Sequence, residues 1–522
     1  MHLLARALDQ RPTTGSFSTN KPLVDNPTML VNPNKVAARE QGLKSTITVA
    51  ILLEYCVSNG QLPNSVPLRN RSSGNFPECF PGICINRLRR AMGKSLSKRE
   101  SGAYGAGVQE ARKFVSQYYG RVPPHQIFFT AGISGGIEYL YDTFLGSTGG
   151  KVLIPNASYP THFASAISYG GIHSVVTVDR TSAGLPDFSS CTNGDNPFAQ
   201  VNLSSFIPFD NPIPIRYPRS FFRNGGTGIF DLNEAAQTDG VIRPIILDWI
   251  YSSFSWGNNP VSIDEVIKLA NENHVLIFLN SISKVFLEPG QRAGVLAVYV
   301  PEHWTTGNIG KVVEGALIRN LNALNSIYLV QGSRTSIAAL VEAHRILMEE
   351  ESMPNAELDG LRMEAKRRFV GEDGSNGNRA IMCAIPHIAP LYPDVMVESS
   401  GYEVFKITGS NLPWKNNLYK QGVLHKFEKL IGQIDDERIR AGAFNALNYF
   451  KQHVPLEKMS PSDIFCLELA METGVATAPG DRFFMLGTAP DEVMFRTVMI
   501  FPEHETRRDA ELISEFLRTK LG

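Results

Sequence analysis

Short apolar runs alternate with helical patterns through the middle of the chain, and this rhythm constrains the fold more than any other feature. The runs IFFT (127–130), KVLIP (151–155), PIILD (244–248) and VLIFLNS (275–281) have the length and residue types of buried strands. Helical patterns lie between them, such as HFASAISYG after KVLIP and SIDEVIKLANENH between the last two runs. This alternation predicts βαβ units and a largely parallel sheet, in which ligands bind beyond the carboxyl ends of the strands.

The chain has 522 residues, more than one hydrophobic core usually serves, so we expect at least two domains. Residues 101–320 carry the α/β pattern and are predicted to form the large domain. Residues 321–522, with longer helical patterns and a mixed segment, predict a smaller C-terminal α+β domain that contains inserts. Residues 1–100 are expected to form an N-terminal arm and part of the small domain.

Composition and charge exclude several classes of protein. The formal net charge is −1, which gives no reason to expect nucleic acid or an acidic membrane surface as a partner. No run approaches the roughly 18–20 apolar residues of a membrane span, since the best candidate, residues 47–57, contains Glu54. The six cysteines are scattered, and the closest pair, Cys79 and Cys84, lacks zinc-ligand spacing. We therefore expect a reduced cytoplasmic protein without a metal site.

The motif SISKVFLEPGQRAG (281–294) directly follows an apolar run. Its lysine, Lys284, is flanked by Ser281 and Ser283 and is followed eight residues later by Arg292. A lysine amine can form an imine with an aldehyde while a hydroxyl and a guanidinium hold a phosphate. The motif by itself leaves open the alternative of a surface lysine after a strand.

A second motif, ILDWIYSSF (246–254), places Asp248 at the end of a predicted strand and Tyr251 three residues later. An aspartate in this position can pair with a pyridinium nitrogen and keep it protonated. Tyr251 can donate a hydrogen bond to a phenolate oxygen of the same ring. An aspartate that caps a helix is the commoner case, so this motif alone is weak.

Two loops complete the candidate site. Gly132, Ile133 and Ser134 form a turn between a predicted strand and a helix, which is typical of a phosphate-binding helix N-terminus. Their spacing matches neither a dinucleotide fingerprint nor a P-loop. Tyr159 follows the strand KVLIP and can stack on an aromatic cofactor ring or, equally well in isolation, cover the edge of the sheet.

In combination these motifs resemble those of the aminotransferase class I/II family, whose members are fold-type I pyridoxal-phosphate (PLP) enzymes. Their order matches: GAYGAGVQEAR, T-x-G, IP-x-x-SYP, ILD-x-x-Y, then S-x-SK with R-x-G, and the spacing around the lysine is similar to the family's. The resemblance runs from about residue 102 to 294 and resumes at VATAPGDRFF (475–484) and FRTVMIF (495–501). It implies a PLP-dependent transferase-like α/β fold, a large domain with a mostly parallel seven-stranded sheet flanked by helices, and PLP bound to Lys284 as a Schiff base.

The resemblance also implies roles for three further residues. Arg496, in FRTVMIF, is expected to grip the substrate α-carboxylate, a task that suits its bidentate guanidinium. Tyr104, in GAYGAG, is similar to the tyrosine that reaches the cofactor phosphate of the neighbouring subunit, which implies a homodimer with shared active sites. The GAY sequence itself resembles alanine-aminotransferase-like members, although the loop 104–107 is a couple of residues shorter than usual.

Asn211, in PFDNPIPIRYP, stands where the family has N-P-T-G, and its amide is expected to bind the cofactor phenolate oxygen and to lie near the substrate. The family's Thr-Gly is replaced here by Ile213-Pro214. Extra residues also follow Asn211 and separate Lys284 from Arg496. These departures favour a specialised substrate or reaction about as well as they favour peripheral decoration.

The resulting prediction is an aminotransferase that acts on an amino acid and a 2-oxo acid. A PLP-dependent lyase, a decarboxylase or a synthase that forms C–C or C–N bonds, including enzymes of specialised metabolism, would use the same core residues and is the alternative. A non-enzymatic ligand sensor with a DNA-binding module is disfavoured, because residues 1–100 contain neither a basic patch nor a helix-turn-helix pattern.

Overall fold

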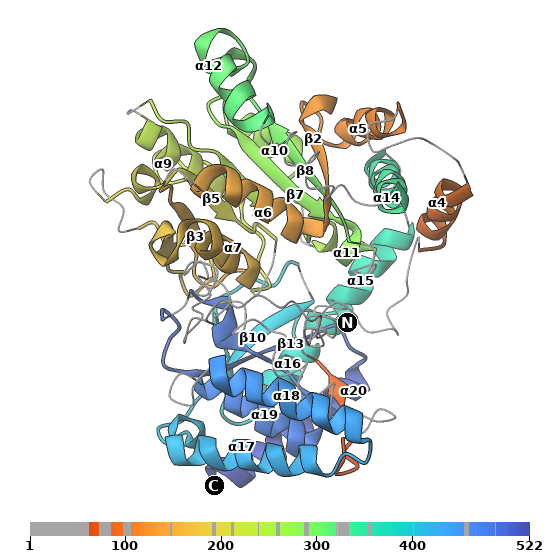
Figure 1. The fold of residues 1–522 in the computed structure, drawn as a ribbon, viewed down its shortest axis with the longest axis vertical. Helices are drawn as coiled ribbons and strands as arrows, with labels where there is room; N and C mark the ends of the chain where they lie inside the picture. The colour runs from red at the N-terminus through yellow and green to blue at the C-terminus, as the bar shows by residue number, and fades with distance from the viewer. Residues whose placement is uncertain are drawn as a thin grey trace, which may run out of the picture. The chain divides into compact units, whose positions relative to one another are not determined.

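The computed structural model of the chain describes residues 62–71, 85–97, 106–146, 149–189, 195–209, 213–237, 240–256, 261–286, 292–319, 321, 334–352, 356–399, 401–453, 459–485 and 487–522. Every described residue belongs to one compact unit of the chain, Pro33–Gly522. That unit contains a seven-stranded sheet and a four-stranded sheet (Figure 1).

The larger sheet has the strand order β2-β8-β7-β6-β5-β3-β4. All strands run parallel except β8, which is antiparallel to both of its neighbours. The structure therefore confirms the predicted α/β class and the mostly parallel seven-stranded sheet. The strands are β2 (Ile127–Ala131), β3 (Val152–Pro155), β4 (Val175–Val178), β5 (Leu203–Phe206), β6 (Ile245–Asp248), β7 (Leu276–Ser281) and β8 (Ala293–Tyr299).

Helices cover this sheet, and most of them belong to the βαβ pattern seen in the sequence. The helical patterns after the strands at 127–130 and 151–155 are α6 and α7. The helices of this part are α4 (Ile85–Ser97), α5 (Ala106–Tyr118), α6 (Gly132–Leu145), α7 (Pro160–Gly170), α8 (Arg219–Phe222), α9 (Ile229–Ala236), α10 (Ile263–Leu269), α11 (Ile282–Val285), α12 (Gly307–Val313) followed by a π-helical turn (Glu314–Ile318), and α14 (Arg334–Ser352).

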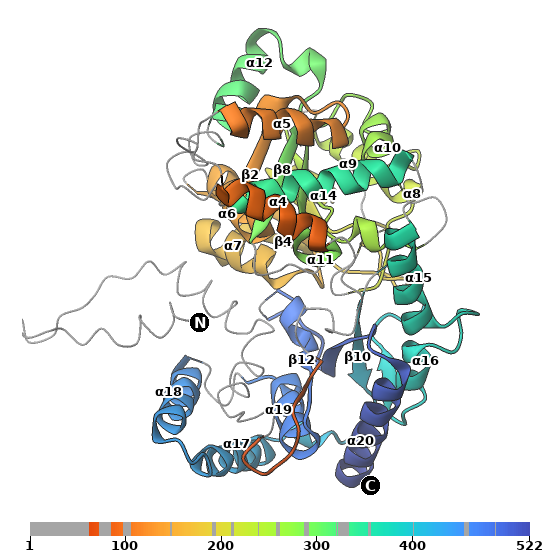
Figure 2. The same ribbon diagram turned by 90° about the vertical axis from the view of Figure 1, so that its right-hand side faces the viewer.

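Side-chain alternation along β7 explains why helices pack on both faces of the sheet. An added Cβ at Gly136 of α6 would lie 3.0 Å from the Leu279 side chain, so glycine lets α6 approach one face closely. The adjacent residue, Phe278, points to the other face, where its ring centre lies 6.3 Å from that of Tyr119. On that second face α14 packs against α5 and β8, with α4 beside it (Figure 2).

The smaller sheet has the antiparallel order β12-β13-β10-β9, and the two-residue strands β1 and β11 pair in parallel beside it. The predicted division into domains at residues 100/101 and 320/321 remains a prediction. The elements are β1 (Arg69–Asn70), β9 (Ile388–Pro390), β10 (Tyr402–Ile407), β11 (Val475–Ala476), β12 (Ala478–Pro479), β13 (Val493–Val498), α15 (Ala356–Val370), α16 (Asn378–Cys383), α17 (Asn417–Gly432), α18 (Glu437–His453), α19 (Pro461–Thr473) and α20 (Glu503–Leu521). Of the helices in the described ranges, none is long and apolar enough to cross a lipid bilayer.

Local sequence fixes both ends of α19, the central helix of this part. Ser460 and Asp463 form a capping box at its start, and Pro461 occupies the first helical position. Gly474 ends the helix in the left-handed conformation, with φ of 76°. Asp463 also pairs with the buried guanidinium of Arg482, so the cap anchors the segment before β13.

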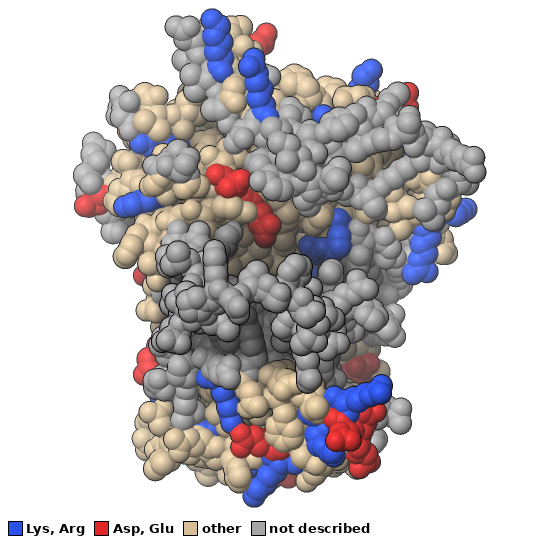
Figure 3. Space-filling model, in the orientation of Figure 1, with Lys and Arg blue, Asp and Glu red and all other residues tan. Residues whose placement is uncertain are grey.

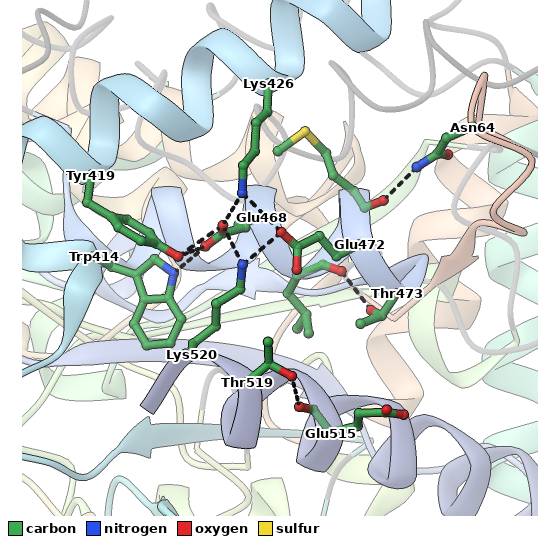
Figure 4. Close-up of polar contacts among 12 residues, drawn as sticks. Asn64, Trp414, Tyr419, Lys426, Glu468, Glu472, Thr473, Glu515, Thr519 and Lys520 are labelled. Carbon is green, nitrogen blue, oxygen red and sulfur yellow. Dashed lines mark hydrogen bonds and ion pairs between the residues drawn. The ribbon is translucent and has the colours of Figure 1, made fainter. Parts of the chain in front are cut away.

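One buried carboxylate joins α17, α19 and α20 (Figure 4). Glu468 of α19 accepts hydrogen bonds from the Trp414 indole N–H and the Tyr419 hydroxyl, each at 2.9 Å. The ammonium groups of Lys426 and Lys520 lie 3.2 and 2.9 Å from the same carboxylate. Burial is the strongest influence and opposes ionisation, but the hydrogen bonds from Lys520 and its neighbours outweigh it and hold the pKa of Glu468 below its ordinary value. A buried charge of this kind is favourable only while its partners are complete.

We predict that Glu468→Gln lowers the free energy of unfolding by about 3 kcal/mol at neutral pH, because two ammonium groups lose a buried partner. Glu472→Gln is the matched control: Glu472 binds the same two lysines but is partly exposed, so its loss should cost less than about 1 kcal/mol. Because the pKa of Glu468 is lower in the folded chain than in the unfolded chain, its contribution to stability is complete above the unfolded pKa, about 4.3. This contribution is lost as pH falls through the pKa of the folded state. Urea unfolding of both variants at neutral and acidic pH measures this, and equal costs at neutral pH would contradict it.

Candidate active site

The residues that follow the parallel strands meet at one edge of the large sheet. Asp248 is the last residue of β6, and Ser281 is the last residue of the neighbouring strand β7. Because β8 is antiparallel, its beginning reaches this same edge, and Gly294 lies in register between Thr130 of β2 and Ser281 of β7. The structure thus brings together the glycine turn, the aspartate and the lysine segment that the sequence singles out.

A glycine turn and an arginine form the part of this edge that suits an anion. Gly132 opens α6 with φ of 73°, a conformation that glycine adopts without strain. Arg292 Nη2 donates to the Ala131 carbonyl at 3.3 Å, which holds the guanidinium against the turn. An added Cβ at Gly132 would lie 3.0 Å from that nitrogen, and one at Gly294 would lie 2.6 Å from the Gly132 carbonyl carbon. Close approach of the two backbones therefore requires glycine at 294, whereas the positive φ is what favours glycine at 132.

The first turns of α6 and α11 complete this cradle. Ile133 and Ser134 lie in the first turn of α6, whose backbone N–H groups have no partner within a helix and attract anions. Ser281 caps α11, since its Oγ accepts the Ser283 N–H at 2.9 Å. A hydroxyl that accepts in this way keeps its own proton to donate to an anion.

Lys284, in α11, lies among aromatic rings. Its Nζ is 5.9 Å from the ring centre of Tyr251 and 5.9 Å from that of Tyr402. The two rings meet edge to face with their centres 6.0 Å apart, and both side chains are fully buried. The amine is therefore next to one ring from the β6 loop and one from β10 of the smaller sheet.

His162, which the sequence motifs did not single out, lies beside Asp248. Its Nε2 is 3.5 Å from Asp248 Oδ2, and both side chains are buried. On the other side of the imidazole, Nδ1 lies 2.9 Å from the Tyr141 hydroxyl and 3.1 Å from Ser205 Oγ. The sequence offered one signal for this histidine, since His162 stands three residues after Tyr159. Tyr159 is half-buried at the start of α7, and its ring contacts the imidazole edge to face.

Strand alternation decides which way Arg496 points. In the β10–β13 register Arg496 is opposite Val404, so it shares a face of the smaller sheet with Tyr402. The guanidinium carbon lies 4.8 Å from the Tyr402 ring centre and 5.0 Å from that of Phe483. The neighbouring residue, Phe495, faces the other way and packs within the helical core of this part.

Hydrogen bonds tie the loop after β3 to the segment beside this arginine. The Asn156 amide accepts from the Met485 N–H at 3.1 Å and donates to Thr488 Oγ1 at 2.9 Å. Two residues on, the Ser158 N–H donates to the Phe483 carbonyl at 2.6 Å. Asn156 and Phe483 are buried, so these bonds fix the contact between the two sheets' loops.

Two of the predicted site residues, Tyr104 and Asn211, lie outside the described residues. Within the described ranges, no group of three or more His, Cys, Asp or Glu side chains could hold a metal ion.

Comparison with known proteins finds similarity to one enzyme family over part of the chain. The model of the aminotransferase class I and II family matches residues 236–369, the segment that contains Asp248, Lys284 and Arg292. S-alkyl-thiohydroximate lyase SUR1 of Arabidopsis thaliana is 26% identical over 249 residues, which are 45% of this chain and 49% of that protein. LL-diaminopimelate aminotransferase of Desulforudis audaxviator is 26% identical over 255 residues, which are 46% of this chain and 59% of that protein. The chain thus spans about half the length of the curated relatives it matches.

Solved structures share the fold across nearly the whole chain. Alanine aminotransferase from Pyrococcus furiosus superimposes with a TM-score of 0.62 at 17% identity, covering 93% of this chain and 97% of that one. Aspartate aminotransferase from Thermotoga maritima gives a TM-score of 0.57 at 14% identity, covering 92% and 97%. Residues 236–369 of the chain are thus similar to the aminotransferase class I and II family, and the described fold is the one found in solved aminotransferase structures.

Proposed function

We propose that this protein is a PLP-dependent aminotransferase that moves an amino group between an amino acid and a 2-oxo acid. The observation that carries the proposal is the position of the Lys284 amine and the Arg496 guanidinium against one buried ring, Tyr402. An amine beside a guanidinium can address the amino and carboxylate groups of one substrate molecule. Asp248 and the glycine turn lie at the same sheet edge as the lysine segment.

The residues present fit PLP. The cradle of Gly132, Ile133, Ser134, Ser281, Ser283 and Arg292 would hold its phosphate, because close backbones, helix N-termini and a guanidinium all suit an anion. Asp248 would pair with its ring nitrogen, Tyr159 would stack on the ring, and Tyr251 would bind the phenolate oxygen. By the family resemblance, Asn211 would share that oxygen, and Tyr104 would reach the phosphate of the partner subunit. When bound, the cofactor supplies an electron sink for negative charge at the substrate α-carbon.

The chain's own residues do three things in this proposal. Arg496 binds the substrate carboxylate in a planar, bidentate pair and so orients the α-carbon towards Lys284. The Lys284 amine would hold the cofactor covalently before the substrate binds, and as a free amine it accepts the α-proton as general base and returns it as general acid. Asp248 would pair with the cofactor ring nitrogen, and the His162 imidazole lies beside its carboxylate.

A PLP-dependent lyase is the second candidate, favoured by the similarity to S-alkyl-thiohydroximate lyase. Decarboxylases and bond-forming synthases would use the same core residues. Mixing the holoenzyme with a panel of amino acids separates these reactions. A cofactor that changes to its amino form and is restored by a 2-oxo acid supports transamination. Release of CO2 or of a substrate leaving group without that cycle contradicts it.

We predict that Lys284→Ala abolishes covalent attachment of the cofactor. Borohydride reduction of the wild-type protein with PLP should leave the cofactor mass on the peptide that contains Lys284, because reduction makes the link permanent. The matched control is Lys268→Ala, an exposed lysine of α10 paired with Asp264, which should keep the label. Peptide mass spectrometry and the visible absorbance of the bound cofactor measure both. An unchanged label in Lys284→Ala, or no bound chromophore in any form, would refute the proposal.

We predict that Asp248→Asn lowers kcat by about 10²–10³-fold, because a neutral amide no longer holds a proton on the cofactor ring nitrogen. His162→Gln keeps the carboxylate but removes its imidazole neighbour, and should lower kcat by about 10–100-fold. His125→Gln, at an exposed histidine of the same part, serves as the control and should retain the wild-type rate. Stopped-flow rates of the half-reaction with the best amino acid measure the series, and wild-type kcat in Asp248→Asn would rule out this role.

We further propose a cytoplasmic homodimer with shared active sites that acts on small molecules. The support is the resemblance of Tyr104 to a residue that serves the neighbouring subunit. Acidic and basic side chains are interspersed on the face drawn in Figure 3, a pattern that does not favour nucleic acid. Light scattering should give twice the mass of one chain, and a fully active monomer would contradict the shared site.

A further inference from the structure

Tyr402 is the point where the smaller sheet meets both charged groups of the candidate site. It is the first residue of β10 and is fully buried. Its ring centre lies 4.8 Å from the Arg496 guanidinium carbon and 5.9 Å from Lys284 Nζ. The ring also contacts Tyr251 edge to face, so one side chain touches the arginine, the lysine and the β6 loop.

We propose that Tyr402 is a specificity-determining residue. Its ring aims Arg496 at the substrate α-carboxylate and forms the surface along which the substrate lies between Arg496 and Lys284. This inference rests on the proposed function and adds the residue that makes the site select α-carboxylates over plain amines.

The register of the smaller sheet makes this arrangement a property of the backbone. Tyr402 pairs with Val498 and Val404 pairs with Arg496, so Tyr402 and Arg496 are diagonal neighbours on one face of two adjacent strands. Diagonal neighbours are within reach of aromatic and long side chains. The next residue of β10, Glu403, points to the opposite face and pairs with Arg379 of α16. A one-residue slip of β10 would therefore replace the ring with a carboxylate beside the arginine.

The contact with the guanidinium is energetically significant because it is out of water. Arg496 is 4% exposed, and cation–π contacts are strongest when both partners are desolvated. The guanidinium stacks on aromatic faces while its N–H groups lie at its edge, so the ring can hold it without competing with a bidentate carboxylate. Phe483 lies 5.0 Å from the same guanidinium carbon, but of the two rings Tyr402 is the one whose contact with Lys284 is established. Tyr402 is thus the ring that couples carboxylate binding to the position of the amine.

The experiment compares three variants of the holoenzyme with two donors. One donor is the amino acid that reacts fastest with the wild type, and the other is the amine that lacks its carboxylate. Tyr402→Leu should raise KM for the amino acid roughly tenfold, with little change for the amine, because the ring contact is lost. Tyr402→Phe keeps the ring and should retain the preference for the amino acid. Phe405→Leu is the matched control: Phe405 is fully buried on the opposite face of the same strand, so its loss should lower stability without changing the preference.

A double-mutant cycle tests whether Tyr402 acts through Arg496. If it does, adding Tyr402→Leu to Arg496→Leu should change KM for the amino acid much less than Tyr402→Leu does alone. Additive effects, or equal losses for both donors in Tyr402→Leu, would overturn the inference. The cofactor absorbance of each variant separates this outcome from failure of the proposed function. A wild type without bound cofactor or amino-donor reaction rejects the function, whereas a reactive wild type with a Tyr402→Leu variant that keeps the wild-type preference for the amino acid rejects only the role of Tyr402.

Discussion

The close backbone contact between Gly294 and Gly132 is the constraint on which the candidate site depends. An added Cβ at Gly294 would lie 2.6 Å from the Gly132 carbonyl carbon, so no other residue allows β8 to begin this close to the turn after β2. This contact sets Arg292 against the turn and places Gly294 in register between Thr130 and Ser281. This one packing requirement therefore brings together the phosphate cradle and the end of β7, beside Lys284.

The smaller sheet supplies the second half of the site. Strand alternation puts Arg496 and Tyr402 on the face away from the aromatic core that contains Phe495. The Asn156 side chain accepts a hydrogen bond from the Met485 N–H and the Ser158 N–H donates to the Phe483 carbonyl, which fixes the loop after β3 against the segment that carries Phe483. The charged groups that would bind the two ends of a substrate therefore come from different sheets, and their distance depends on how those sheets meet.

Buried charged groups hold the smaller sheet and its helices in this geometry. The capping box of α19 shares Asp463 with the buried guanidinium of Arg482, just before the phenylalanine that contacts Arg496. Glu468 joins α17, α19 and α20 behind the sheet through buried hydrogen bonds. Both arrangements use buried charges, which favour one geometry because a displaced partner leaves an unpaired ion.

The features that depend on neighbouring residues could be predicted from the amino-acid sequence. Apolar runs and helical spacing predicted the parallel sheet, and the motifs around Gly132, Asp248 and Lys284 identified the edge where these residues meet, because period and local turn chemistry are properties of neighbouring residues. Three sets of contacts could be recognised only in the folded chain. His162 lies beside Asp248, Tyr402 lies against Arg496 and Lys284, and Asn156 bridges two loops. These contacts join residues far apart in the chain, where burial and strand register select the neighbours, and no local pattern encodes that choice.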